Sequence, residues 1–184
     1  LCEELLSHST INSVSLRYFN PIGSHSSSLI GDYSLDKANN LIPILTEVAN
    51  GKRKELIVFG NDYKTKDGTC IRDYIHVVDL ANAHVKALDY IFINKKKIAF
   101  NIGTGKGVSV LEAITAFEKT NELKIDYSIG PKRDGDIEKI FADNTLSNSQ
   151  LKWKAKKTLE EALSSAWNWE KKKLIWKLAN EKSK

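Results

Sequence analysis

Two arginines in polar turns are the residues of this chain best suited to bind an anion. Arg72 follows the polar stretch GNDYKTKDGTCI, residues 60–71, and precedes an apolar run, while Arg133 lies in the turn KRDGD, residues 132–136. The planar guanidinium group gives two parallel, charge-assisted hydrogen bonds to a phosphate. Taken from residue types alone, this pattern predicts a binder of a phosphorylated small molecule.

Three further polar residues could complete such a site. Asn20 follows a predicted strand, Asn40 opens a predicted helix, and Asp136 lies in the same turn as the second arginine. A helix N-terminus favours a negatively charged ligand, and a carboxylate can accept a hydrogen bond from a sugar or ribose hydroxyl. The structural alternatives are a turn former for Asn20, a helix cap for Asn40 and a surface ion pair with Asp73 for Arg72.

The other motifs form no self-contained catalytic set. The stretch NIGTGKGVS, residues 101–109, lacks the G-x-G-x-x-G spacing of dinucleotide-binding loops, so we interpret it as a tight turn into a capped helix. We expect His76 to be a hydrogen-bonded core residue and His84 to be structural. Cys2 and Cys70 match neither a disulfide framework nor a zinc pattern, which predicts reduced thiols and no metal site.

The composition is that of an ordinary globular protein with an excess of lysine. The 184 residues carry a net charge of +5, and lysines form runs at 95–97 and 171–173. A nucleic-acid-binding surface is one interpretation. We favour a lysine-rich exterior, because the runs are scattered and lack interleaved aromatic residues. No apolar run approaches the roughly 20 residues of a membrane span. We therefore predict a cytosolic protein that binds neither nucleic acid nor a membrane.

Strand and helix patterns alternate along the chain. Strands are predicted at residues 13–19, 55–59, 74–78, 98–103 and 124–130. Helices are predicted at residues 39–51, at 79–91, from 109 to about 120, near 144–151 and from 158 towards 176, with N-caps at Asn39 or Asn40, Asp79, Ser109 and Thr158. The alternation predicts an α/β fold with a partly parallel sheet.

We expect these strands to form two groups. Residues 13–19, 74–78 and 98–102 are apolar enough for a central sheet. Residues 55–59 and 124–129 would form a smaller second sheet with the C-terminal helices.

Five segments together resemble the UDP-glucose 4-epimerases, which are extended short-chain dehydrogenase/reductases. The segments are LRYFNPIGSH, NNLIP, VFGNDYKTKDGTCIRDYIHVVDLA, FNIGTGKGVSVLE and KRDGD. RYFNP and RDYIHV resemble many sugar-nucleotide enzymes of the superfamily, whereas the polar stretch GNDYKTKDGT is more specific to the 4-epimerases. The resemblance covers nearly the whole chain, as the C-terminal half of the family's polypeptide.

The resemblance implies an α/β fold made of two parts. The first comprises the last strands and helices of a Rossmann-type parallel sheet, and the second is a smaller α/β UDP-sugar-binding domain. Residues 13–19 and 74–103 would belong to the Rossmann sheet. Residues 20–73 and 104–184 would belong mainly to the substrate-binding domain.

The implied activity is an NAD-dependent isomerisation in galactose metabolism. The family interconverts UDP-glucose and UDP-galactose by oxidation and reduction at sugar C4, usually as a homodimer. The N-terminal half binds most of the NAD, and the catalytic Tyr-x-x-x-Lys pair would fall just before Leu1. The chain opens on the uncapped helix pattern LCEELLSH, residues 1–8, and contains no methionine. We therefore expect a piece of a longer protein that has no catalytic residue of its own and is inactive alone.

Carried over position by position, the resemblance implies specific contacts. Phe19 would line the nicotinamide end of the cofactor, Arg72 and Arg133 would clamp the diphosphate, and Asp136 would contact the ribose. The other residues implied to contact the UDP-sugar are Asn20, Asn40, Leu41, Ile57, Val58, Phe59 and Ile140. The intermediate size of Ile140 predicts a preference for UDP-glucose and UDP-galactose over N-acetylated sugars, with simple packing as its alternative role.

Two other functions compete with this interpretation. One is a different sugar-nucleotide enzyme of the superfamily, such as a dehydratase or decarboxylase, against which the long polar stretch argues. The other is a noncatalytic module that binds a nucleotide sugar or, given the lysine runs, a nucleic acid.

Overall fold

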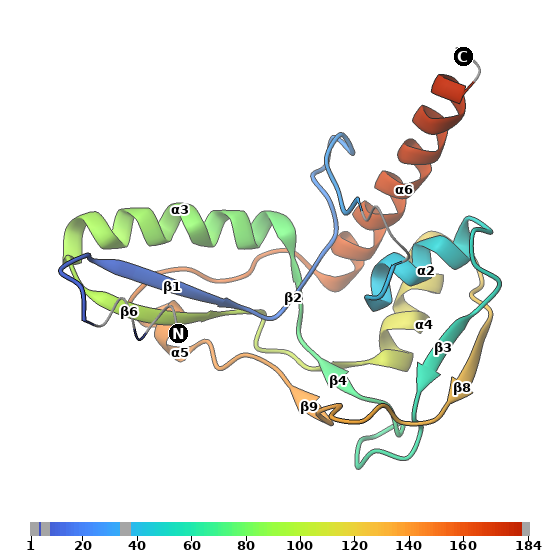
Figure 1. Ribbon diagram of the computed structural model, residues 1–184, viewed down its shortest axis with the longest axis horizontal. Helices are drawn as coiled ribbons and strands as arrows, with labels where there is room; N and C mark the ends of the chain where they lie inside the picture. The colour runs from blue at the N-terminus through green and yellow to red at the C-terminus, as the bar shows by residue number, and fades with distance from the viewer. Residues whose placement is uncertain (1–3, 5–7, 34–37, 182–184) are drawn as a thin grey trace.

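The computed structural model describes residue 4, residues 8–33 and residues 38–181, the last of these only as backbone from residue 174 onward. The chain forms two connected parts (Figure 1). We call the first part the arm; it contains β1 (Ser13–Tyr18), α3 (Val77–Asn94), β6 (Lys97–Ile102) and α5 (Thr145–Ser149). The second part, the lobe, contains α2 (Leu41–Ala49), β3 (Leu56–Phe59), α4 (Val110–Asn121), β8 (Tyr127–Gly130) and the start of α6 (Leu159–Glu181).

Short strands lie where the arm meets the lobe. They are β2 (Asn20–Ile22), β4 (Ile71–Arg72), β5 (Tyr74–His76), β7 (Val108–Ser109) and β9 (Lys139–Ile140). β2 pairs with β5 in parallel, while β4 lies between antiparallel β7 and parallel β9. The predicted α/β class with parallel strand pairs is confirmed.

The arm is a parallel strand pair covered by a long helix. β1 and β6 pair from Ser13 opposite Lys97 to Tyr18 opposite Ile102, as expected for the predicted strands. α3 lies along this pair (Figure 1), and its inner side chains pack with Phe100 and Ile102, which are fully buried.

The expected three-stranded central sheet is wrong in one respect. The predicted strand 74–78 ends at His76 and pairs with β2 rather than with β1 or β6. The physical reason lies in the course of the chain after Tyr18. The amide of Phe19 still donates to Ile102 O at 3.2 Å, but the amide of Asn20 donates to Asp73 O at 2.9 Å. One extended segment therefore passes from one strand partner to another.

The predicted N-cap of α3 is also wrong. His76, not Asp79, is the N-cap, because its Nδ1 accepts a hydrogen bond from the Val78 amide at 3.0 Å. Burial lowers the pKa of His76 and keeps the imidazole neutral, as an acceptor must be. The Asp79 carboxylate instead accepts from the amides of Lys156 and Lys157 at 2.9 and 2.7 Å. It fixes the segment before α6 to the start of α3.

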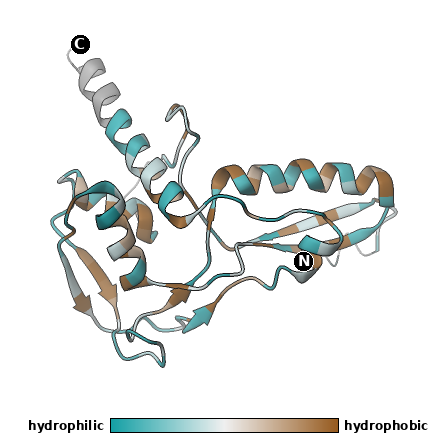
Figure 2. Cartoon of the chain, turned by 180° about the vertical axis from the view of Figure 1, so that it is seen from behind, coloured by the Kyte–Doolittle hydropathy of each residue, from teal (hydrophilic) through white to brown (hydrophobic). Residues whose placement is uncertain are grey.

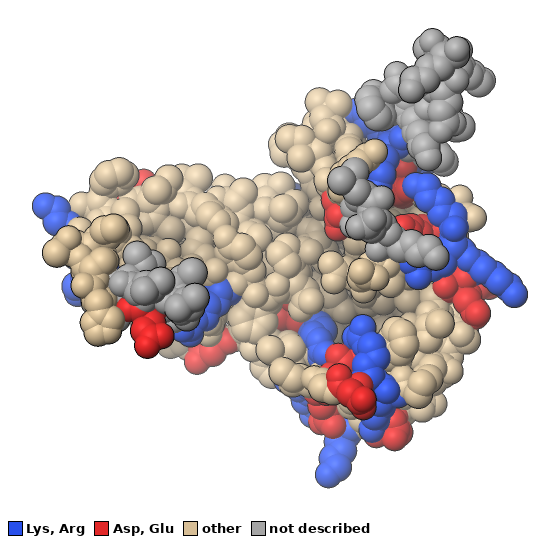
Figure 3. Space-filling view, in the orientation of Figure 1, with Lys and Arg blue, Asp and Glu red and all other residues tan. Residues whose placement is uncertain are grey.

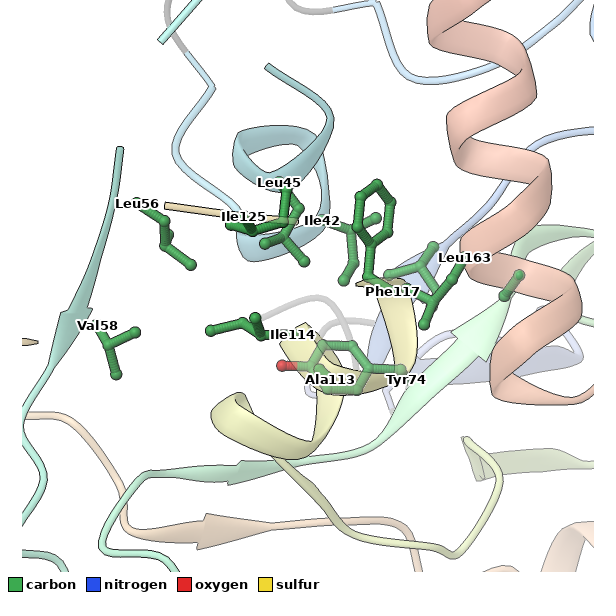
Figure 4. Packing of buried hydrophobic residues seen from close by; sticks show 12 residues of the cluster. Ile42, Leu45, Leu56, Val58, Tyr74, Ala113, Ile114, Phe117, Ile125 and Leu163 are labelled. Carbon is green, nitrogen blue, oxygen red and sulfur yellow. The ribbon is translucent and has the colours of Figure 1, made fainter. Parts of the chain in front are cut away.

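The lobe has its own sheet and core. β3 and β8 pair in parallel, from Leu56 opposite Tyr127 to Phe59 opposite Gly130, which confirms the predicted second sheet, although β8 is shorter than residues 124–130. β3, with the sequence LIVF, is strongly apolar (Figure 2). Side chains from α2, α4, β3 and α6 meet in one cluster (Figure 4), with Leu45, Phe117 and Leu163 fully buried at its centre.

Most predicted helix starts are confirmed. Ser109 and Glu112 form the predicted capping box of α4. At the start of α6, the Glu161 amide donates to Thr158 Oγ1 at 3.1 Å and the Thr158 amide donates to Glu161 Oε2 at 2.8 Å. α6 continues past the predicted end to Glu181. The predicted opening helix, residues 1–8, lies almost entirely outside the described residues.

Two features are absent from the described residues. Among their helices, none is both long and apolar enough to cross a membrane. In the same part of the chain, no three His, Cys, Asp or Glu side chains gather as metal ligands would.

The lobe core gives a first prediction. Phe117→Ala should lower the free energy of unfolding by about 3–5 kcal/mol, because it leaves a cavity in a fully packed cluster. Phe92→Ala is the matched control, since that ring is 77% exposed. Denaturant unfolding of both variants measures the difference, and equal losses would contradict the assigned core.

Candidate functional site

A cavity of about 430 Å³ lies at the junction of the arm and the lobe. Its lining includes ten of the eleven residues that the sequence singled out: Phe19, Asn20, Asn40, Leu41, Ile57, Val58, Phe59, Arg72, Arg133 and Asp136. They come from five separate segments of the chain. The structure thus brings together side chains that the sequence keeps far apart.

Ile140 is the exception among the predicted site residues. It does not line the cavity, but the β4–β9 register places it directly opposite Arg72. Its side chain is 39% exposed. Ile140 is therefore a strand neighbour of a site residue, Arg72, without lining the cavity itself.

The two arginines converge on one carboxylate. Arg133 Nε and Nη2 donate to Asp136 at 3.0 and 3.2 Å, and Arg72 Nη2 lies 3.5 Å from Asp136 Oδ1. Arg72 Nη1 also donates to Ile137 O at 2.6 Å. The Arg133 guanidinium lies over the Phe59 ring, 4.8 Å from its centroid. Two cationic forks held side by side are suited to a doubly charged, multi-oxygen anion such as a diphosphate.

Asp73 fixes the backbone next to Arg72. The surface ion pair considered from the sequence is wrong, because Asp73 is fully buried and its carboxylate bonds to backbone amides. It accepts from Thr104 N, Gly105 N and Ala142 N at 2.8, 2.9 and 3.1 Å. These bonds close the glycine-rich stretch as the predicted tight turn. They also hold the segment after β9 against β4.

The N-terminus of α2 forms another wall of the cavity. Asn40 occupies the predicted N-cap position, but its side chain makes no capping hydrogen bond. Residues 39–44 all line the cavity. The positive end of the helix dipole therefore faces this space, which favours a negatively charged group.

Tyr74 and Cys70 also line the cavity and were not predicted from the sequence. Burial raises the pKa of Tyr74, so its phenol stays protonated. Cys70 is a buried, free thiol. A signal for Tyr74 existed: it stands two residues after Arg72 in extended chain, so both side chains point to the same side.

A second, larger cavity of about 530 Å³ lies on the other side of α2. Its walls are mostly apolar and include Ile22, Ile42 and Trp169, but none of the residues predicted to bind a ligand. The convergent charges, rather than the volume, single out the smaller cavity as the candidate site.

Comparison with known proteins identifies the family. A family model described as GDP-mannose 4,6 dehydratase matches residues 2–166. The chain belongs to this family of NAD-dependent epimerases and dehydratases. Within the family it is a homologue of the UDP-glucose 4-epimerases, as the sequence motifs indicated.

UDP-glucose 4-epimerases are among the relatives that this chain matches. The enzyme of Bacillus subtilis (strain 168) is 50% identical over 155 residues, which cover 84% of this chain and 46% of the relative. A UDP-glucose-4-epimerase structure from Stenotrophomonas maltophila, with bound NAD and formylated UDP-arabinopyranose, has a TM-score of 0.92 and 43% identity over 95% of this chain and 53% of that chain. The Bifidobacterium longum enzyme, in complex with NAD+ and UDP, has a TM-score of 0.86 and 44% identity over 93% of this chain and 51% of that chain.

The chain spans about half the length of the curated relatives it matches. The fold and the family membership are therefore properties of this chain, while the activity of a whole epimerase is a separate question.

The role of Asp73 gives a second prediction. Asp73→Asn places an amide donor against backbone amides and should cost about 2–4 kcal/mol of unfolding free energy, since a buried acceptor is lost. Asp134→Asn, in an exposed turn, is the control and should change little. Thermal or denaturant unfolding measures the stability of both variants. An Asp73→Asn protein as stable as the parent sequence would contradict the role assigned to Asp73.

Proposed function

We propose that this chain carries the UDP-sugar site of a UDP-glucose 4-epimerase. The observation that supports this most strongly is the convergence of Arg72 and Arg133 on Asp136 in a cavity lined by ten predicted site residues. Related structures contain UDP or a UDP-sugar together with NAD. The identity of 45–50% to curated epimerases favours this activity over the dehydratase or decarboxylase alternative.

The diphosphate lies between the two guanidinium groups in this proposal. Without ligand, Asp136 balances part of their charge, and its carboxylate is only 17% exposed. A diphosphate brings enough negative charge to engage both forks. The N-terminus of α2 adds a favourable field at the same wall of the cavity.

The uridine and the sugar occupy opposite ends of the cavity. The strand Ile57, Val58 and Phe59 forms the wall that we assign to uracil, and Asp136 also reaches the ribose. Asn20, the first residue of β2, is assigned to the sugar end.

Phe19 is the residue of this chain that we assign to the cofactor. It follows the carboxyl end of β1 and lines the same cavity, the position in which parallel α/β sheets bind ligands. The chain contains no dinucleotide-binding glycine motif. We therefore assign Phe19 to the nicotinamide ring of the cofactor and no residue of this chain to the cofactor's phosphates. When bound, NAD supplies the hydride transfer at sugar C4.

Three finer assignments complete the proposal. Residues 13–19 and 74–103 belong to the Rossmann sheet of the parent enzyme, and the rest mainly to the substrate domain. The parent is a cytoplasmic homodimer, in keeping with the free thiol of Cys70. Ile140 favours UDP-glucose and UDP-galactose over N-acetylated sugars, acting from the strand beside Arg72.

Removing either arginine tests the site directly. Arg72→Ala and Arg133→Ala should each weaken UDP binding by about 10- to 100-fold, because each removes a charge-assisted contact to phosphate. Arg17→Ala loses the same charge on β1, away from the cavity, and should bind UDP normally. Isothermal titration of the 184-residue chain with UDP and with uridine measures these differences.

Two outcomes would contradict the proposed site. One is unchanged UDP affinity in both cavity variants. The other is salt-dependent binding of random RNA with no response to UDP, which would favour a nucleic-acid-binding module.

The catalytic state of the isolated chain is a separate prediction. Because no Tyr-x-x-x-Lys pair is found among the described residues that line the cavity, the purified 184-residue chain should not interconvert UDP-galactose and UDP-glucose. Chromatography of the two sugar nucleotides after incubation with NAD measures this. Turnover by the pure chain would refute the assignment of catalysis to residues outside it, and a dehydrated or decarboxylated product would refute the epimerase assignment.

A further inference from the structure

The polar stretch before Arg72 forms a closed structure of its own. We call residues 60–69 the polar loop. Within it, the Tyr63 amide donates to Gly68 O at 2.9 Å, Thr65 Oγ1 donates to Thr69 O at 2.8 Å, and the Thr69 amide donates to Asp67 Oδ1 at 2.9 Å. These bonds join both ends of the loop. A loop closed by its own hydrogen bonds keeps a fixed shape. It can therefore hold a neighbouring segment in place as well as connect two strands.

The polar loop is anchored on the start of α4. Ser109, the N-cap of α4, donates to the Asp67 carboxylate. Burial opposes ionisation of Asp67, but the hydrogen bonds from Ser109 and Thr69 outweigh it and lower its pKa. The Val110 amide donates to Cys70 O at 3.1 Å. The base of the loop is thus attached to the helix that carries the lobe core.

The other side of the polar loop holds the segment that carries Arg133. Lys132 Nζ lies 3.1 Å from Asp62 Oδ1 and 4.4 Å from the centroid of the Tyr63 ring. The Lys64 amide donates to Glu138 Oε2 at 2.8 Å. Lys132 and Glu138 stand on either side of the turn with Arg133 and Asp136, so the loop contacts this turn at both ends. Figure 3 shows basic and acidic side chains close together on the lobe.

We propose that the polar loop positions the second arginine of the site, with Lys132 and Glu138 as positioning residues. The inference rests on the proposed UDP-sugar site, because it assigns a role toward the same ligand. Arg72 is placed by the strands around it, whereas Arg133 lies in an exposed turn closed by one long backbone hydrogen bond, from Asp136 N to Arg133 O at 3.3 Å. Arg133 meets Asp136 within this turn, while Lys132 and Glu138 attach the turn itself to the polar loop.

A pure charge effect and a positioning effect predict opposite changes in UDP affinity for the substitution Glu138→Ala. Glu138→Ala removes a negative charge near the two arginines, so a simple field effect would tighten UDP binding. It also removes the acceptor of the Lys64 amide. If that bond positions the turn, UDP binding weakens instead.

Asp134→Ala is the matched control. Asp134 is exposed, lies beside Arg133 in the same turn, and has no contact with the polar loop among the interactions of the described residues. The substitution removes an equal charge from the residue next to Arg133 and leaves the contacts of the polar loop intact. Its UDP affinity should be unchanged or slightly tighter.

The experiment compares UDP and uridine binding to the 184-residue chain and its variants. We expect Glu138→Ala to weaken UDP binding by about fivefold or more, since small displacements of a binding group carry large costs, while uridine affinity changes little. Tyr63→Ala, which removes the ring beneath Lys132, should act in the same direction. Tyr63→Phe keeps the ring and should restore near-normal UDP binding.

Hydrogen exchange without ligand gives a readout independent of UDP. In Glu138→Ala, the amide of Asp136 should exchange faster, while the core amides of α4 keep their protection and show that the chain is folded. In Asp134→Ala that amide should exchange as in the parent sequence.

Each outcome decides between the two claims. Weaker UDP binding with faster exchange in Glu138→Ala alone supports positioning by the loop. If the unaltered chain binds UDP but Glu138→Ala and Asp134→Ala behave alike, the positioning role is overturned while the proposed site stands. If the unaltered chain does not bind UDP, the proposed site fails, and this inference fails with it.

Discussion

Two guanidinium groups held beside one carboxylate are the interaction on which the rest of this structure depends. Arg72 and Arg133 carry like charges, and Asp136 offsets their repulsion by accepting two hydrogen bonds from Arg133 and forming an ion pair with Arg72. The pair can exist without a ligand because of this carboxylate. It is also charged strongly enough to bind a diphosphate, which is the group that UDP and UDP-sugars share.

The surrounding fold keeps the two arginines at this distance. Asp73, buried beside Arg72, ties β4 to the glycine-rich turn and to the segment after β9. The polar loop meets the other arginine's turn through Lys132 and Glu138. Both supports are made by acidic or basic side chains bonded to backbone or to each other. The polar composition of residues 60–69 is therefore explained by the contacts the loop makes, not by exposure alone.

Local patterns in the sequence predicted the parts of the fold that local physics decides. The capping boxes at Ser109 and Thr158 follow from a side chain and an amide three residues apart, so they could be predicted without tertiary contacts. Asp79 has the right residue type for a cap, but two distant amides, of Lys156 and Lys157, compete for its carboxylate. Strands of two residues, such as β4, have no periodicity from which to be predicted.

The candidate site likewise has features that follow from local sequence and features that depend on long-range contacts. Residue types predicted that the two arginines bind an anion, but not that they meet, since the contact depends on long-range packing. Only the resemblance to a known family indicated that residues from five segments share one cavity. Asp73 was considered as a surface partner because its burial depends on Thr104, Gly105 and Ala142, which the sequence does not place nearby.

Side-chain NMR of the arginines tests the central claim most directly. The chain has four arginines, Arg17, Arg53, Arg72 and Arg133, so their Nε–H signals can be assigned by substitution. Addition of UDP, and of inorganic pyrophosphate, should shift the signals of Arg72 and Arg133 together, while uridine leaves them in place. If UDP shifts neither of these signals, or shifts Arg17 and Arg53 equally, the two guanidinium groups do not form a diphosphate site.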